Sequence, residues 1–216
     1  MRIYDHGMGA YKRNLMRLGA DRWNGAVYYS HEIVRNIIPR VKTDRSWVTV
    51  NCKGMAEDRA IVFVHNNKRP DHYEWLSKYD DLVLVCGVPS TCEKVAHLGT
   101  AVHLPLSIDV AEVEAFARKK DRGTCYVGRA GKRAGLKFPA AVDYLEGMPR
   151  REMLGQLARY RKAYAVGRCA LEAKVLGCEV LPYDERFPDP SIWQVIDNRD
   201  AAGILQGLLD AIDGEV

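Results

Sequence analysis

The sequence predicts an α/β protein in two halves, each built around a parallel β-sheet. Short apolar runs alternate with helical patterns along almost all of the 216 residues, which is typical of repeated strand–helix–strand units. Residues 82–86 form a continuous apolar run, as expected for a strand that is covered on both faces. A charged stretch over residues 107–122 separates two groups of such runs, and we place the boundary between the halves there.

The first half is expected to hold six strands joined by helices. Residues 60–64 have the composition of a buried strand, and residues 31–38 have the spacing of an amphipathic helix. A further helix begins at Pro89 and is stopped by Gly99. The predicted strands of this half are residues 2–5, 26–29, 47–51, 60–64, 82–86 and 102–104, and another helix is predicted over 11–18.

The second half repeats the alternation with shorter elements. Pro149 suits the first turn of a helix whose apolar face carries Met153, Leu154 and Leu157. The predicted strands are 125–127, 141–145, 163–166 and 179–181, with further helices over 170–176 and 200–212. The predicted domains are an N-terminal half over 1–109, a connector over 110–122, a C-terminal half over 123–198 and a final helix over 199–216.

The composition is that of an ordinary soluble globular protein, with 47% hydrophobic and 28% charged residues. The net charge of +4 is accounted for either by solvated cations or by attraction to a phosphate-bearing partner. No apolar stretch approaches the about 20 residues that span a bilayer, and the N-terminus has no signal-peptide pattern. The six cysteines form no C-x-x-C pair and have no histidine at zinc-finger spacing. We therefore expect reduced thiols, no metal site and a cytoplasmic location.

Functional residues are expected directly after strands, because ligands of open α/β sheets bind outside the carboxyl ends of the strands. Gly9 follows the first predicted strand, where a glycine lets the backbone approach a ligand; a plain turn is the simpler interpretation. His65 follows the strand at 60–64, where it could contact a sugar hydroxyl or transfer a proton. An Asn-rich turn is the alternative for His65.

Two further candidates lie in the second half. Gly128, Arg129 and Lys132 follow the strand at 125–127, and glycine with cations at a strand end suits a diphosphate. A solvated basic loop is the alternative. Glu172 lies near the start of an otherwise apolar helix, where a carboxylate is costly unless it meets a partner. A ribose diol would be such a partner, and an exposed glutamate on the helix face is the alternative.

In their order, these elements resemble the GT-B glycosyltransferases, particularly the retaining family 4 type, over about residues 60–213. VHLPLSID at 102–109 resembles the segment between the two domains of that family, and YVGR at 126–129 with Lys132 resembles the start of its donor domain. YLEGMPRREM at 144–153 resembles the segment whose loop contacts the nucleotide base, and LEAKVLGCEVL at 171–181 resembles the donor-side glutamate motif.

The resemblance implies two Rossmann-like halves facing across a cleft, with the acceptor in the first half and the donor in the second. It implies transfer of a sugar from a nucleotide-diphosphate sugar to an unknown acceptor, as in hexosyltransferases, with no metal and no other cofactor. The implied catalytic residues are His65, Arg129 and Lys132, of which the two cations hold the diphosphate and stabilise the leaving group. The implied donor-binding residues are Gly9, Gly128, Arg129, Lys132, Glu172 for the ribose, and Leu145, Gly147 and Met148 for the base.

The chain departs from the family pattern at the first glutamate of the E-x7-E motif, where it has Tyr164. Two alternatives to an active transferase therefore stay open. One is a catalytically inactive module that binds a nucleotide sugar. The other is a glycosyltransferase that acts on nucleic acid. The mildly basic net charge and clusters of cationic residues, such as residues 68–69, suggest this alternative.

Overall fold

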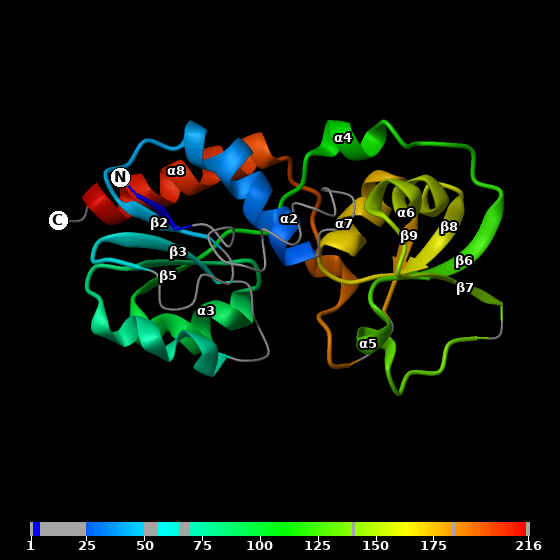
Figure 1. Ribbon diagram of the computed structural model, residues 1–216, viewed down its shortest axis with the longest axis horizontal. Coiled ribbons are helices and arrows are strands. Elements are labelled where there is room, and N and C mark those ends of the chain that lie inside the picture. The colour runs from blue at the N-terminus through cyan, green and yellow to red at the C-terminus, as the bar shows by residue number, and fades with distance from the viewer. Residues whose placement is uncertain are drawn as a thin grey trace. The chain divides into compact units, whose positions relative to one another are not determined.

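The computed structural model describes residues 2–4, 25–49, 56–64, 70–139, 141–182 and 185–214 of the chain. The chain forms two compact units. Unit 1 comprises Met1–Pro105 together with Asn198–Val216, and unit 2 comprises Leu106–Asp197. Each unit has one parallel β-sheet with helical connections (Figure 1), so the predicted α/β class with two parallel sheets is confirmed.

Unit 1 contains a five-stranded sheet in which the strands follow one another in chain order. The central strand β3 is buried at all five positions, which agrees with its continuous apolar sequence. Neighbouring strands pair in parallel throughout. The strands are β1 (Ile3–Tyr4), β2 (Ser46–Val48), β3 (Ala60–Val64), β4 (Val83–Cys86) and β5 (Thr100–His103).

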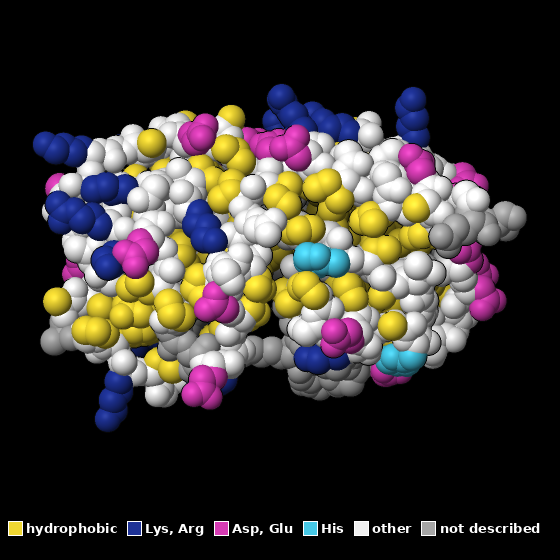
Figure 2. All heavy atoms as spheres, turned by 180° about the vertical axis from the view of Figure 1, so that it is seen from behind, with side chains coloured by type: hydrophobic (Ala, Val, Ile, Leu, Met, Phe, Trp, Pro, Cys, Tyr) yellow, Lys and Arg dark blue, Asp and Glu magenta, His cyan; other side chains and the backbone are white. Residues whose placement is uncertain are grey.

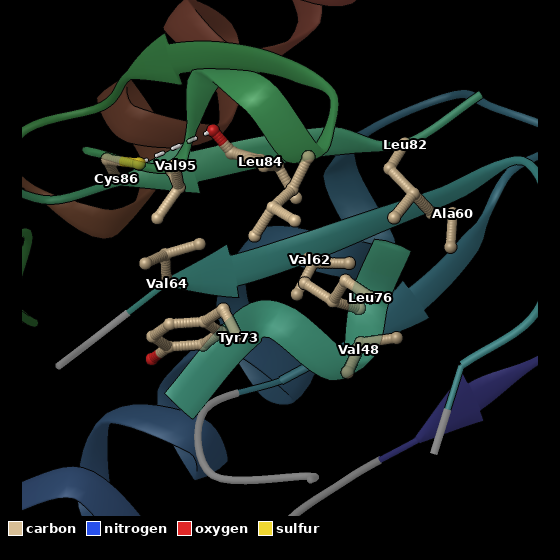
Figure 3. Close-up of a cluster of buried hydrophobic side chains, with 11 residues drawn as sticks. Val48, Ala60, Val62, Val64, Tyr73, Leu76, Leu82, Leu84, Cys86 and Val95 are labelled. Carbon is tan, nitrogen blue, oxygen red and sulfur yellow. Dashed lines mark hydrogen bonds between the residues drawn. The ribbon is translucent and has the colours of Figure 1, made fainter. Parts of the chain in front are cut away.

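Helices cover both faces of this sheet (Figure 1). On one face, Tyr73 and Leu76 pack with Val62 and Val64 in a buried cluster that also includes Val95 (Figure 3). On the other face, the ring of Tyr29 meets Phe63 edge-on, and Trp47 stacks on the same ring at 6.3 Å. The first face is covered by η5 (Pro70–Lys78), α3 (Pro89–Val95) and η6 (Ala96–Leu98), and the second by α2 (Gly25–Glu32), the π-turn η3 (Ile33–Ile37), η4 (Ile38–Arg40) and α8 (Asn198–Gly214).

The strand predicted over residues 26–29 is wrong, because this segment is part of helix α2. Tyr29, Ile33 and Ile37 are all buried and lie four residues apart, which places them on one face of a helix. Valine and tyrosine favour strands only where a sheet surface is there for them to pack on. Here they instead pack from a helix onto the completed sheet.

Unit 2 contains a four-stranded parallel sheet in the order β7-β6-β8-β9. Its connector from unit 1 is helical only in α4, and Asp109 caps that helix by accepting from the Glu112 N–H at 3.0 Å. The strands are β6 (Arg122–Val127), β7 (Val142–Leu145), β8 (Tyr160–Tyr164) and β9 (Glu179–Leu181). The helices are α4 (Val110–Glu114), α5 (Ala130–Arg133), α6 (Arg150–Leu157), α7 (Arg168–Val175) and η7 (Pro190–Ile192).

Helix α8 is a part of unit 1, although it follows unit 2 in the chain. Near its C-terminal end, Asp213 accepts a hydrogen bond from Arg45 at 2.7 Å. Gln206 exchanges hydrogen bonds with the backbone of Lys42, at 2.6 Å and 3.2 Å. The compact units thus divide the chain after Pro105 and before Asn198. Within the described residues, none of the helices has the length and hydropathy to cross a bilayer.

Candidate functional site

The carboxyl ends of the unit 2 strands carry most of the residues that the sequence singled out. The chain runs from β6 to β7, which pairs with one edge of β6. It then continues to β8, which pairs with the other edge of β6. The gap between the carboxyl ends of β6 and β8 is therefore a topological switch point, where open parallel sheets bind their ligands. The loop 128–129 follows β6 at this edge, and the loop 165–167 follows β8.

Gly128 lies directly over the ring of Tyr126. A Cβ atom at residue 128 would lie 2.7 Å from the Tyr126 hydroxyl, which is too close for a side chain. That hydroxyl donates a hydrogen bond to the carbonyl oxygen of Arg129 at 2.7 Å. Burial raises the pKa of Tyr126 to about 12, so the hydroxyl keeps its proton and remains a donor. The contact with Tyr126 therefore explains why residue 128 is a glycine.

We expect Gly128→Ala to lower the free energy of unfolding by about 2 kcal/mol, because the new methyl group must displace the Tyr126 hydroxyl. Denaturant unfolding measures this loss. Gly131→Ala is the matched control, since a Cβ there meets nothing within 4 Å. The double variant Tyr126→Phe with Gly128→Ala should recover part of the loss. Equal stability of Gly128→Ala and Gly131→Ala would contradict this reading of the contact.

The cations after β6 fall into two groups. Arg129 and Lys132 are exposed at the start and in the middle of α5. Arg133, one residue further, instead turns back to Glu146 in the loop after β7 and forms two hydrogen bonds, at 2.6 Å and 2.9 Å. Arg129 and Lys132 are thus the fully exposed cations of this segment, whereas Arg133 is half-buried and is held by Glu146.

The loop after β7 lies beside the loop after β6. The N–H of Gly128 donates to the carbonyl oxygen of Leu145 at 3.5 Å. Leu145 is buried at the end of β7, whereas Met148 is half-buried. Gly147 has a φ of +71°, a backbone conformation that glycine adopts without strain. The residues that the resemblance assigns to the base are thus adjacent to those that it assigns to the diphosphate.

Glu172 lies on α7 and is only 3% exposed. Its Oε1 accepts a hydrogen bond from Nε of Arg150, the first residue of α6, at 3.1 Å. Nη2 of Arg168, one helical turn earlier on α7, is 3.9 Å from the same oxygen. Arg150 also binds Glu112 of α4, at 2.7 Å. The partner that the buried carboxylate needs is therefore supplied by two arginines of the chain itself.

Several charged side chains act on the thiol of Cys169. Burial raises the pKa of the Cys169 thiol to about 11, and the carboxylate of Glu172 raises it further. Lys132, Arg168 and Arg150 act on the same thiol in the opposite direction. The charges of Lys132 and Glu172 thus both act on this thiol. Among the described residues, the contacts given above do not join Arg129 or Lys132 to Glu172, so the convergence of these side chains stays a prediction.

Two predicted site residues, Gly9 and His65, lie outside the described residues. Their predicted roles near the phosphates and the donor sugar stay predictions. Within the described ranges, no group of three or more histidine, cysteine, aspartate or glutamate side chains is placed to hold a metal ion.

Sequence reasoning missed Arg150 and Arg168. The spacing of four residues between Arg168 and Glu172 on a predicted helix is a signal that could have found the first pair. Arg150 comes from another helix, 22 residues earlier, so only the fold brings it to Glu172.

Comparison of the chain with protein-family models, with curated proteins and with solved structures finds no match. The class of protein therefore rests on the fold and on the charges at the carboxyl edge of unit 2.

Proposed function

We propose that unit 2 binds the diphosphate of a nucleotide sugar at the carboxyl edge of its sheet, and that the protein is a glycosyltransferase of the GT-B-like type. One observation carries the proposal: the exposed cations Arg129 and Lys132 follow β6 directly, at the switch point between β6 and β8. Under the GT-B-like resemblance, unit 1 would hold the acceptor.

The charge balance of this edge favours an anion. Glu112 and Glu172 are the carboxylates paired with Arg150, and Glu172 is also close to Arg168. Lys132 adds a further cation in α5, and Arg129 adds one more directly before that helix. Cations therefore outnumber carboxylates, and a diphosphate would restore the balance through charge-assisted hydrogen bonds.

Glu172 supports the assignment of the ribose to this edge. Both of its ion pairs engage Oε1, and Oε2 takes part in neither. The contact with Arg150 fixes the carboxylate in one orientation. We assign the ribose hydroxyl to this second oxygen, which can accept a hydrogen bond. Because the side chain is 4% exposed, neighbouring side chains must move to admit the ribose.

Isothermal titration with UDP, GDP, ADP and their sugars tests the proposal. We expect one of these series to bind, and Lys132→Gln or Arg129→Gln to weaken that binding about tenfold, because each removes a charge-assisted contact. Lys119→Gln and Arg118→Gln are matched controls, since these exposed cations lie in the segment that leads into the amino end of β6. Absence of binding by the wild-type protein, or equal losses in the control variants, would overturn the proposal.

Tyr164 favours a second candidate, a module that binds the donor without transferring the sugar. It stands at the end of β8, where the resemblance places a glutamate, and its ring packs on Phe138 at a centroid distance of 4.7 Å. The phenol of a tyrosine offers a sugar a single hydroxyl, whereas a carboxylate accepts hydrogen bonds through two oxygens. A bound nucleotide sugar that stays intact after long incubation would support this candidate, and released nucleotide with transferred or free sugar would exclude it.

A further inference from the structure

The guanidinium of Arg133 is held at the carboxyl end of β7 by Glu146 and lies over the ring of Tyr144. Glu146 holds the guanidinium of Arg133 through two hydrogen bonds, from Nε at 2.9 Å and from Nη2 at 2.6 Å. The guanidinium carbon lies 4.6 Å from the centroid of the Tyr144 ring. This two-point contact fixes the plane of the guanidinium, because the fork geometry of arginine matches that of a carboxylate.

The arrangement leaves part of the guanidinium open. The side chain of Arg133 is 35% exposed, that of Glu146 is 21% exposed, and Tyr144 is 44% exposed. Hydrophobic side chains also gather at the surface of unit 2, on the left in Figure 2, with Lys and Arg side chains near them. The Arg133 hydrogen bonds lower the pKa of Glu146, so the pair stays intact at neutral pH.

The two-point pair and the contact with Tyr144 also stabilise unit 2 by a modest amount. A guanidinium plane is a stacking surface for a nucleobase. Arg133 lies one residue beyond Lys132, which we assign to the diphosphate, and Glu146 lies between Leu145 and Gly147 of the proposed base loop. The plane is thus next to both parts of the proposed nucleotide site.

We propose that the guanidinium plane of Arg133, held by Glu146 and backed by Tyr144, is the surface on which the nucleotide base stacks. This inference rests on the proposed function, since it concerns the base of the same nucleotide. Glu146 acts here as a positioning residue, because it orients the guanidinium and need not touch the base.

Titration with a nucleoside diphosphate and with inorganic pyrophosphate tests the inference. Arg133→Lys keeps the charge and removes the plane. We expect it to weaken the binding of the preferred nucleoside diphosphate about tenfold and to change the binding of pyrophosphate less than about twofold. Lys132→Gln should weaken both ligands, because it acts on the phosphates. Thermal unfolding of each variant checks that unit 2 remains folded.

Glu146→Gln provides a second test. It should affect the two ligands in different ways, which a purely structural role of Glu146 would not do. We expect weaker binding of the nucleoside diphosphate, because the guanidinium loses one of its two bonds to residue 146. We expect pyrophosphate binding to be equal or tighter, because a negative charge near the phosphates is gone. If Arg133→Lys weakens both ligands equally, or neither, the base does not stack on Arg133 although the proposed site stands. If the wild-type protein binds neither ligand, the proposed function and this inference both fail.

Discussion

Arg150→Leu is expected to lower the free energy of unfolding by about 3–5 kcal/mol, because it leaves a buried carboxylate without its main partner. The side chain of Glu172 is 4% exposed, and Arg150 donates to it at 3.1 Å. After the substitution, only Arg168 remains near Oε1, at 3.9 Å. The leucine fills part of the space but offers no hydrogen bond. Denaturant unfolding of the purified protein measures the loss.

Two further variants separate the ion pair from other causes. Arg151→Leu is the matched control, since Arg151 is the next residue of α6 and is exposed. Glu172→Gln in the Arg150→Leu background should restore part of the stability, because a neutral amide costs less to bury than an unpaired carboxylate. If Arg150→Leu and Arg151→Leu cost the same, the buried pair does not hold α6 and α7 together.

Arg45→Met in unit 1 is expected to lower the free energy of unfolding by about 2 kcal/mol, because it removes charge-assisted hydrogen bonds of a buried side chain. The side chain of Arg45 is 2% exposed. It donates to the backbone oxygen of Asp81 at 2.8 Å, to the carboxylate of Asp81 at 2.9 Å and to Asp213 at 2.7 Å. Arg45 thereby ties β2 to the C-terminal end of α8. Hydrogen exchange of the last turns of α8 should become faster in the variant.

Arg59→Met is the matched control for Arg45. Arg59 contacts the same two aspartates, with Asp81 at 2.9 Å and Asp213 at 3.9 Å, but its side chain is 46% exposed. We expect only a small loss, because water replaces the contacts of an exposed cation. Equal losses for Arg45→Met and Arg59→Met would mean that burial is not the reason for the effect of Arg45.

Most strands were predictable because a parallel sheet selects continuous apolar sequences. Residues 60–64, which are apolar throughout, match β3 at both ends. The exception at residues 26–29 arose because a short run of valine and tyrosine does not distinguish a strand from a buried helix. The spacing of Tyr29 with Ile33 and Ile37 was visible in the sequence. The position of this helix on the sheet, however, depends on the contact of Tyr29 with Phe63, more than 30 residues away in the chain.

The site was predictable only where neighbours in the chain define it. Gly128, Arg129 and Lys132 follow a strand, and that alone places them at the carboxyl edge. The partners of Glu172 and of Arg133 were not predictable, because they come from helix α6 and from the loop after β7. The charge of each of these residues follows from the sequence, whereas the partner with which each forms an ion pair depends on how the strands are ordered in the sheet.

Amide chemical-shift mapping of the isotope-labelled protein, titrated with UDP, GDP and ADP, locates the bound nucleotide residue by residue. We expect saturable shifts for one nucleotide at the amides of Gly128, Arg129, Gly147 and Gly167, all at the carboxyl edge of unit 2. Shifts confined to residues 117–121 at the amino edge, or no shifts with any of the three nucleotides, would contradict a nucleotide site at the ends of β6, β7 and β8.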